Sequence, residues 1–385
     1  NYSDPNGLIN PFGLGSATPS LETLANARSG RYQMLELPRR AGPAIEPRWH
    51  VLDQRDGQGP LHSELLHQIQ CHLDQRGQVL LYRNRRGYAP VLMCNACGWS
   101  ADCERCSAHM TWHQSGSRLQ CHHCGASRSE PRRCPDCGEP KLKPLGAGTE
   151  RLEVLLKDHF PDVPVHRVDR DQLSGKHDFQ SLIETVRLGE PCILVGTQML
   201  AKGHHLPQVT LAAVLDTDAA LFSSDFRAPE RLGQAVHQVA GRAGRADRPG
   251  AFYLQTHHPD HALLGSLVHQ GYLAYAEALL AERQQADLPP TTALALIRAE
   301  AHQCRPARGF LQDASAVVRA PGLSIAGPVP AILSRRGGYW RFQLWVQAPD
   351  RRTLAERLNA CLGSLHALPS ARQVRWHVDM DAVEL

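Results

Sequence analysis

The sequence lacks a membrane-length apolar run, a legible signal peptide and a strong net charge. None of its 385 residues belongs to an uninterrupted apolar run of about eighteen, so no transmembrane helix and no membrane contact are expected. The chain begins Asn-Tyr-Ser-Asp, with neither an initiator Met nor a basic segment before an apolar core, and we expect its first residue to be internal to a longer protein. The net charge of +4 excludes a histone-like polycation and leaves nucleic-acid contact to local patches.

Lysine is scarce, with five Lys against 37 Arg. An excess of Arg suits phosphate recognition, because the planar guanidinium pairs with phosphate through two hydrogen bonds. A GC-rich coding bias explains the excess at least as well. The Arg content alone therefore decides nothing about function.

Cysteine is scarce outside one short window. Of the 12 Cys, eight form four Cys-x-x-Cys pairs between positions 94 and 137, and the others are scattered singly, at Cys71, Cys192, Cys304 and Cys361. A secreted disulfide-bonded protein of this length would not concentrate its cysteines in this way, whereas metal sites in a reducing cytosol do. The pattern predicts a cytoplasmic zinc protein. A redox enzyme that uses Cys-x-x-Cys pairs is the alternative, and it would require labile metal and exchangeable thiols.

The four pairs predict two structural zinc ions. Each Cys-x-x-Cys turn presents two thiolates, and a tetrahedral zinc needs two such turns. Four turns can be joined in three ways. The gap of fourteen residues after the second pair favours an inner site (Cys103, Cys106, Cys121, Cys124) nested inside an outer one (Cys94, Cys97, Cys134, Cys137). Neighbouring histidines could substitute, but with complete thiolate sets we expect them outside the coordination sphere (His109, His113, His122, His123).

The remaining pattern predicts an α/β domain into which the cysteine window is inserted. Helical periodicity over 61–76 is followed by an apolar strand at 79–82, and helices and strands alternate after the cysteine window up to residue 255. Apolar β-branched runs between amphipathic helices are typical of a parallel sheet with crossover helices. A long helix over 262–286 ends before Pro289-Pro290, and the last ninety-five or so residues predict a separate α+β domain.

Three segments are candidates for phosphate handling. Residues 15–19 (Gly-Ser-Ala-Thr-Pro) form a small, hydroxylated loop that is a weak signal alone. Residues 196–205 form a Gly-bounded loop after the strand at 192–195, where backbone N–H groups can approach phosphates. Residues 238–245 (Gln-Val-Ala-Gly-Arg-Ala-Gly-Arg) place Arg242 and Arg245 on one face of a helix that starts near Pro229. They suit arginine fingers that reach a γ-phosphate, and a solvated basic helix end is the alternative.

Together these segments resemble three motifs of superfamily 2 helicases: 15–19 is similar to motif III, 196–205 to motif V and 238–245 to motif VI. Asn84-Arg85-Arg86-Gly87-Tyr88 precedes the eight-cysteine insertion, and Arg-Arg-Gly-Gly-Tyr-Trp at 335–340 lies in the last domain. With them, the chain from Gly15 to its end resembles the PriA (primosomal protein N′) family of replication-restart helicases. The resemblance implies RecA-like helicase lobes, ATP-driven 3′→5′ DNA unwinding, and recognition of abandoned forks for reloading of the replicative helicase.

The resemblance also implies roles for single residues. Arg242 and Arg245 would contact the γ-phosphate of ATP, with Gln238 nearby. Ser16 and Thr18 would couple hydrolysis to strand movement, and Thr197 with Gly203 would line the cleft between ATP and DNA. The nested zinc pairing is that of the family. The implied partners are forked and single-stranded DNA, other primosome proteins and single-stranded-DNA-binding protein, for a monomer in the cytoplasm at the nucleoid.

The resemblance divides the chain into six parts. These are the end of helicase lobe 1 (1–43), the start of lobe 2 (44–93), the two-zinc insertion (94–137), the rest of lobe 2 (138–258), a helical linker (259–290) and a C-terminal DNA- and partner-binding domain (291–385). Residues 1–12 do not resemble the family, and Thr291-Thr292 stands where the family has an aromatic residue.

Two motifs of a complete ATPase are missing. The sequence has no Gly-x-x-x-x-Gly-Lys-[Ser/Thr] segment, and no Asp-Glu dipeptide occurs in it. These elements hold the β- and γ-phosphates and the Mg²⁺, so we expect this chain alone to be inactive as an ATPase. A non-catalytic zinc-containing module that binds DNA and docks partners is the alternative function.

The C-terminal domain contains the best candidates for DNA contact. Between positions 305 and 352 there are eight Arg and no Lys against two acids, a local balance of +6. Arg for phosphates and aromatic rings for bases hold single strands without sequence preference. The alternation at 340–346 is half-buried strand periodicity, so Trp340 is expected in the core. Arg335 and Arg336, on an expected loop before Gly337-Gly338, are the preferred DNA contacts.

Overall fold

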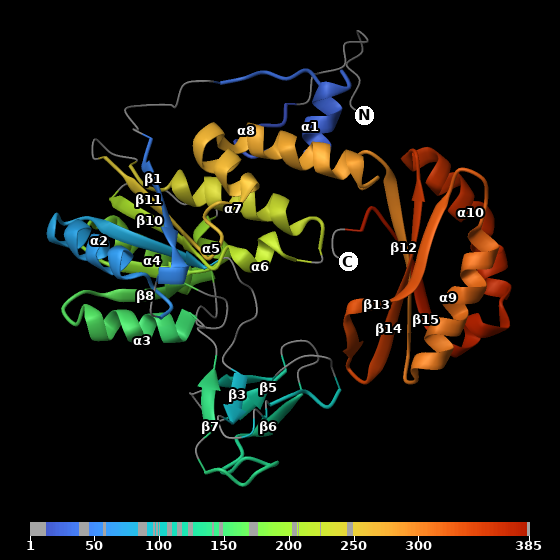
Figure 1. The fold of residues 1–385 in the computed structure, drawn as a ribbon, viewed down its shortest axis with the longest axis horizontal. Coiled ribbons are helices and arrows are strands. Elements are labelled where there is room, and N and C mark those ends of the chain that lie inside the picture. The colour runs from blue at the N-terminus through green and yellow to red at the C-terminus, as the bar shows by residue number, and fades with distance from the viewer. Residues whose placement is uncertain are drawn as a thin grey trace.

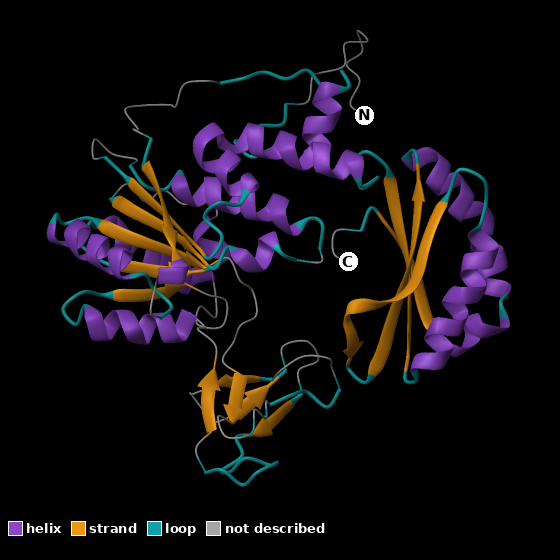
Figure 2. Cartoon of the chain, viewed as in Figure 1, coloured by secondary structure: helices purple, strands orange, loops and turns teal. Residues whose placement is uncertain are grey.

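A computed structural model describes most of the chain. The described residues are 13–37, 46–56, 59–83, 91–94, 97, 99, 101–105, 110–113, 118–121, 126–140, 142–145, 149–168, 176–201, 206, 208–223, 225–244 and 249–382. They form three sheets with their helices: an α/β domain, a small inserted module and a C-terminal domain (Figure 1, Figure 2).

The α/β domain is built on a parallel sheet of six strands in the order β1-β11-β10-β2-β9-β8. All of its neighbouring strands pair in parallel. The continuous apolar runs that the sequence shows are buried on both faces, and every residue of β10 is buried, as expected for a sheet covered on both sides. The strands are β1 (Arg48–Asp53), β2 (Gln78–Arg83), β8 (Val165–Val168), β9 (Ile193–Gly196), β10 (Val209–Leu215) and β11 (Ala251–Thr256).

Helices cover both faces of this sheet (Figure 1). Helices α2 (Ser63–Asp74) and α3 (Thr149–His159) share an apolar cluster with one face. Five helices share a larger cluster with the other face: α1 (Leu21–Arg28), α4 (Lys176–Arg187), α5 (Gln198–Ala201), α7 (Ala228–Ala240) and α8 (Ala262–Gln285). Short α6 (Asp218–Leu221) and a 3₁₀ turn, η1 (Gln54–Asp56), follow strands β10 and β1.

The inserted module is a small antiparallel sheet in the order β6-β5-β4-β3-β7. Its strands are β3 (Val91–Cys94), β4 (Thr111–His113), β5 (Arg118–Gln120), β6 (Ser127–Ser129) and β7 (Leu142–Leu145). Its apolar cluster is small and contains Leu92, Met110 and Leu119 beside two cysteines. So few buried side chains rarely stabilise a fold without further cross-links, which suits a metal-stabilised module.

The C-terminal domain has a four-stranded antiparallel sheet in the order β13-β14-β12-β15. Two helices cover one face of the sheet and share its main apolar cluster. The other face carries a small cluster of Leu294, Leu296 and Ala382, against which Trp345 and Phe226 of the α/β domain pack. The elements are β12 (Ala293–Ala301), α9 (Cys304–Val318), β13 (Ser324–Arg336), β14 (Tyr339–Ala348), α10 (Arg351–Ala367), η2 (Pro369–Gln373) and β15 (Arg375–Met380).

The architecture confirms the predicted fold class, an α/β domain with a cysteine-rich insertion and a C-terminal α+β domain. Two local expectations are wrong. Helix α7 ends at Ala240, so Arg242 lies in the turn after the helix and not on a helical face, because Gly241 caps the helix and Gly244 adopts a left-handed φ of 74°. Arg335 and Arg336 are the last residues of β13 and not of a loop, because Gly337 and Gly338 alone make the turn.

The long helix α8 is also bent, because Gly271 inside it has a φ of 85°. Within the described part of the chain, none of the helices combines the length and the apolar character that a membrane span requires.

Candidate nucleotide, metal and nucleic-acid sites

Two of the candidate phosphate-handling segments meet in space. The Nε2 of Gln238, on α7, donates a hydrogen bond of 3.1 Å to the Oγ1 of Thr18. Thr18 is buried, and its backbone N–H donates to the Oγ of Ser16 at 3.0 Å. The structure therefore brings Ser16, Thr18 and Gln238 together.

The segment around Thr18 is held between α7 and α8. Ser20 caps the N-terminus of α1 by accepting from the backbone N–H of Thr23 at 3.2 Å. The backbone N–H of Leu21 donates to Glu230 Oε1 of α7 at 3.0 Å, and the hydroxyl of Tyr272 of α8 donates to the Pro19 carbonyl at 2.7 Å. Burial raises the pKa of Tyr272, so this phenol stays a hydrogen-bond donor at physiological pH.

Arg242 lies at the end of the same helix. It is 4% exposed, and its backbone N–H donates to the Val239 carbonyl at 2.9 Å in the turn that closes α7. Gly244 then donates to the Val209 carbonyl at 3.2 Å, which fixes the turn to strand β10. Arg242 is therefore buried in the turn at the end of the helix that carries Gln238. Arg245 lies outside the described residues.

The third segment follows β9. Gly196 ends that strand where a Cβ would lie 2.4 Å from the Val168 carbonyl, so only glycine fits this close approach of two strands. Thr197 comes next and accepts from the backbone N–H of Leu200 at 2.9 Å, at the first turn of α5. Thr197 thus lies at the carboxyl edge of the sheet, and Gly203 lies outside the described residues.

The outer set of cysteines forms a compact thiol cluster. The sulfur atoms of Cys94, Cys97, Cys134 and Cys137 all lie within 4.8 Å of one another. The Cys94–Cys137 and Cys97–Cys134 sulfur distances are both 3.6 Å. Four thiolates around a zinc with bonds of about 2.3 Å would be about 3.8 Å apart, so the cluster fits a tetrahedral ion.

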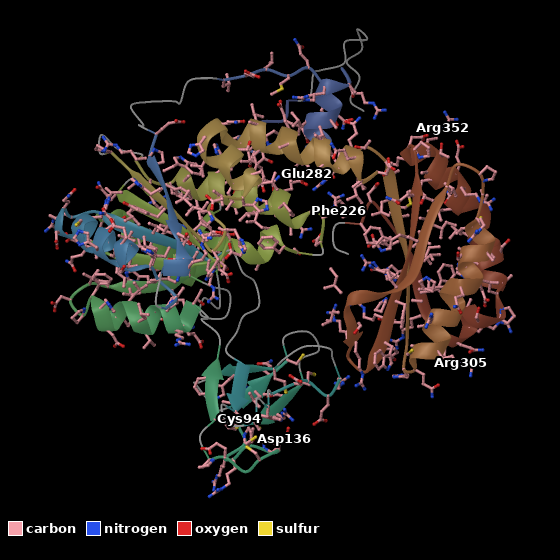
Figure 3. The ribbon with its side chains drawn as sticks, viewed as in Figure 1. Cys94, Asp136, Phe226, Glu282, Arg305 and Arg352 are labelled. Atoms are coloured by element: carbon pink, nitrogen blue, oxygen red, sulfur yellow. The ribbon has the colours of Figure 1, made fainter. Side chains whose placement is uncertain are left out.

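The backbone of each outer turn is set for metal binding. Cys94 ends β3 and its N–H donates to the Trp99 carbonyl at 2.8 Å. Cys134 donates to the Glu139 carbonyl at 2.8 Å, and Gly138, with a φ of 77°, donates back to Cys134 at 3.0 Å. Figure 3 shows the yellow sulfur atoms beside Cys94 at the far end of the module.

Only half of the inner set can be located. Cys103 and Cys121 are both buried in the small apolar cluster of the module. The backbone N–H of Cys121 donates to the Ala126 carbonyl at 2.8 Å, a turn like those of the outer set. Cys106 and Cys124 lie outside the described residues, as do His109, His122 and His123. A second zinc site therefore stays a prediction.

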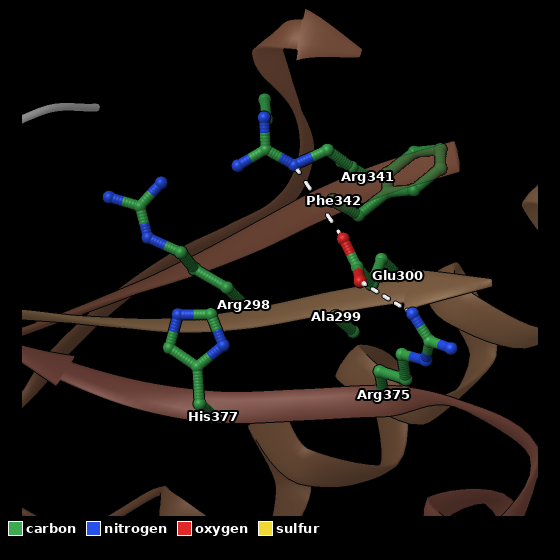
Figure 4. Close-up of a pocket in the computed structure, with 8 residues that line it drawn as sticks. Arg298, Ala299, Glu300, Arg341, Phe342, Arg375 and His377 are labelled. Carbon is green, nitrogen blue, oxygen red and sulfur yellow. Dashed lines mark ion pairs between the residues drawn. The ribbon is translucent and has the colours of Figure 1, made fainter. Parts of the chain in front are cut away.

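The C-terminal sheet carries basic side chains at the end of its β13–β14 hairpin and on the face that α9 and α10 leave open. Arg335 and Arg336 end β13, and the guanidinium of Arg335 lies 5.6 Å from the centre of the half-buried Trp340 ring. Deeper on the sheet, a small pocket is lined by Arg298, Arg341, Arg375 and His377 around Glu300 (Figure 4). Burial and the charges of Arg336 and Arg298 lower the pKa of Arg341.

Acidic groups on this face only partly balance its cations. Glu300 lies 3.9 Å from both Arg341 and Arg375, and Arg298 pairs with Asp379 at 3.1 Å. Sequence reasoning missed Arg298, Arg375 and His377. The sequence signal that could have found them is the alternation of polar residues along β12 and β15. Residues two apart in a strand lie on the same face of the sheet.

Two family models match parts of this chain. The model of the primosomal protein N C-terminal domain matches residues 284–383, and that of the PriA DNA helicase Cys-rich region domain matches residues 103–128. A solved structure of S. cerevisiae Dbp5 bound to RNA and ADP BeF3 covers 70% of this chain and 47% of that chain at 13% identity, with a TM-score of 0.31, too low to support an inference.

Several related sequences are named replication restart protein PriA. The protein from Haemophilus influenzae is 46% identical over 97% of this chain and 51% of its own length. Those from Rickettsia felis and Bacillus subtilis are 34% and 32% identical, over 95% and 96% of this chain and 57% and 47% of their own lengths. The chain thus spans about half the length of the curated relatives it matches, and over that span it is similar to proteins named replication restart protein PriA.

Proposed function

We propose that this chain is part of an ATP-dependent 3′→5′ DNA helicase that recognises stalled or abandoned replication forks and initiates primosome assembly. In this proposal residues 1–43 end helicase lobe 1, and residues 44–93 and 138–258 form lobe 2. Residues 94–137 form the two-zinc insertion, 259–290 the helical linker and 291–385 the C-terminal DNA- and partner-binding domain. The proposed location is the cytoplasm, at the nucleoid.

One observation carries the ATP-dependent part of the proposal. Thr18 and Gln238 share a hydrogen bond, and the buried Arg242 follows on the same helix end. A hydroxyl segment, an amide and an arginine in this arrangement support a site that senses the γ-phosphate and passes its state to α1. Arg242, together with Arg245, would stabilise the negative charge that develops on the transferred phosphoryl group.

The chain would supply only the arginine half of the nucleotide site. Its sequence lacks the Gly-x-x-x-x-Gly-Lys-[Ser/Thr] motif, which holds phosphates, and the Asp-Glu motif, which holds Mg²⁺. ATP and Mg²⁺ would therefore bind against another lobe of the complete protein. Zinc would have no role in the nucleotide site. Closed sites with four thiolates leave no position for substrate, so both ions would be structural.

An ATPase assay tests the split site. We expect no turnover by this chain with forked DNA, and appreciable turnover would contradict the proposal. In the complete protein, Arg242→Ala should lower kcat by roughly 10³-fold or more. The exposed Arg151 of α3 is a matched control, because Arg151→Ala removes the same charge from the same domain away from α7.

DNA binding would occur on the basic face of the C-terminal sheet. Arg336 shares this face with the cations around Glu300, and Arg335 lies beside it at the hairpin end of β13, opposite Trp340. Arginines that neutralise phosphates release counterions, so binding should weaken as salt rises. Stacking of a base on a ring beside Arg335 would add affinity without sequence preference.

A charge-matched pair of variants tests this face. Arg335→Ala with Arg336→Ala should weaken binding to a forked DNA and flatten its salt dependence. Arg305→Ala with Arg308→Ala removes the same charge from α9, which covers the opposite face of the sheet, and should change binding little. Equal affinity of both double variants at every salt concentration would refute the proposed face.

The second candidate is a non-catalytic zinc-containing module that binds DNA and docks partners. The observation that favours it is the missing phosphate- and magnesium-holding motifs. The coding sequence upstream of residue 1 discriminates the two candidates, because the helicase requires both motifs there.

A further inference from the structure

A buried ion pair joins the α/β domain to the C-terminal domain. Glu230 of α7 and Arg283 of α8 lie 2.7 Å apart between Oε2 and Nη2, and their side chains are 6% and 4% exposed. The pair lies on the helix that carries Gln238 and on the helix that leads into the C-terminal domain.

Each partner of this pair also binds other segments. Glu230 uses its second oxygen to accept from the backbone N–H of Leu21, the first residue of α1. Arg283 donates to the carbonyl of Pro289, ahead of β12, at 3.1 Å and to the carbonyl of Phe226 at 3.3 Å. One ion pair thus ties α1, α7, α8 and the segment that leads into the C-terminal domain.

The Phe226 ring extends the connection to the C-terminal sheet. The guanidinium of Arg283 lies 5.0 Å from the centre of this ring. Phe226 and Trp345 both pack against the cluster of Leu294, Leu296 and Ala382, on the face of the sheet that α9 and α10 leave open. Figure 3 shows Phe226 between the α/β domain and the C-terminal domain.

A buried ion pair of this kind specifies an arrangement more than it stabilises one. Desolvation of two charges offsets most of their attraction, so apolar residues of similar volume often give equal stability. An apolar side chain at position 283, however, could not bind a carboxylate and two carbonyls in fixed directions. Only the planar guanidinium, with five N–H donors, makes these bonds together.

We propose that Glu230 and Arg283 are a positioning pair that fixes the C-terminal domain at one angle to α7 and α1. Through the pair, a movement of Thr18 or Gln238 is passed to Pro289 and so to the basic sheet face. This inference deepens the proposed function, because it supplies a route from the nucleotide site to the DNA-binding domain.

Single-molecule FRET tests the positioning without ATP or DNA. The dyes go on the exposed positions Asp158 of α3 and Ser364 of α10, introduced through unnatural amino acids so that the cysteines stay untouched. We expect one narrow efficiency peak for the wild-type chain. Arg283→Lys keeps a cation beside Glu230 but cannot make the other bonds, so the single peak should be lost.

An exposed ion pair is the matched control. Arg28 and Glu277 also join α1 to α8, with side chains 54% and 48% exposed. Arg28→Lys should leave the peak unchanged. Circular dichroism checks that the Arg283→Lys variant is folded. If it is not folded, the Glu230→Gln variant replaces it in the FRET experiment, because glutamine keeps an oxygen that can accept from the backbone N–H of Leu21.

The outcomes separate the positioning pair from the proposed function. A narrow, unshifted peak in a folded Arg283→Lys or Glu230→Gln variant would overturn the positioning role. A broad wild-type peak would overturn it as well. Lack of ATP hydrolysis by the complete protein would instead refute the helicase proposal and leave the FRET result standing.

Discussion

Thr18 and Gln238 are 220 positions apart in the sequence, and they share one hydrogen bond of 3.1 Å. Both residues were singled out from the sequence as parts of separate motifs. Nothing in either motif gives the pairing, because a hydrogen bond between distant segments depends on how their helices pack. The same holds for Glu230 and Arg283, which carry no sequence signal at all.

Removal of the Thr18 hydroxyl should lower the stability of the fold. Thr18→Val keeps the shape of the side chain but removes the hydrogen bond from Gln238, so we expect a loss of about 0.5–1.5 kcal/mol in the free energy of unfolding. Urea denaturation measures it. Thr185→Val is the control, since this exposed hydroxyl donates to the Ser181 carbonyl within α4. Equal losses in the two variants would contradict a special role for Thr18.

His72 predicts a dependence of stability on pH. Its Nδ1 lies 2.9 Å from the Thr210 hydroxyl, and burial lowers its pKa below the usual 6.5. The unfolded chain therefore takes up this proton first as pH falls, so stability that is complete above pH 6.5 is lost as pH drops through the lowered pKa. Urea midpoints between pH 8 and 5 should fall less steeply for His72→Gln. An identical slope would contradict the assignment to His72.

At the scale of elements, α7 and α8 pack through a close contact at Gly233. A Cβ there would lie 2.2 Å from the ring of Tyr275, which is fully buried and donates to the Pro229 carbonyl at 2.6 Å. The periodicity of the sequence predicted both helices. It did not predict their mutual contact, because a glycine inside a helix does not reveal what packs against it.

Substitution of Gly233 should therefore separate the two helices. Gly233→Ala forces the Tyr275 ring to move, and overpacking of this kind costs about 1–3 kcal/mol of unfolding free energy. Gly265→Ala on α8 is the control. A Cβ there meets open space, so the same change should stabilise the helix by about 0.5–1 kcal/mol. Thermal unfolding should show a lower Tm for Gly233→Ala and a higher Tm for Gly265→Ala. A Gly233→Ala variant as stable as the wild type would refute the close contact.

At the scale of the whole molecule, the cysteine-rich module touches the C-terminal domain. The backbone N–H of Gly338, in the turn between β13 and β14, donates to the Arg105 carbonyl at 2.8 Å. The Arg105 guanidinium donates back to the Gly337 carbonyl at 3.2 Å. Both glycines have positive φ values, 60° and 88°, as a two-residue hairpin turn requires.

Zinc removal should unfold the module and release this turn. Structural zinc contributes roughly 10–16 kcal/mol in small peptides, and the module has little other core. After chelation, hydrogen exchange should rise in residues 118–145 and at Gly338, while β10 and β12 stay protected. Loss of protection throughout the chain would show that the module does not unfold independently.

The sequence by itself determined most of the secondary structure, the fold class and the eight cysteines that could hold zinc. These follow from periodicity and spacing, which are local properties of the chain. Only the tertiary structure decided that Gln238 meets Thr18, that Arg242 leaves the helix, and that Arg298, Arg375 and His377 share one sheet face. The physical reason is that side-chain partners far apart in sequence are set by packing and strand register, which no single segment contains.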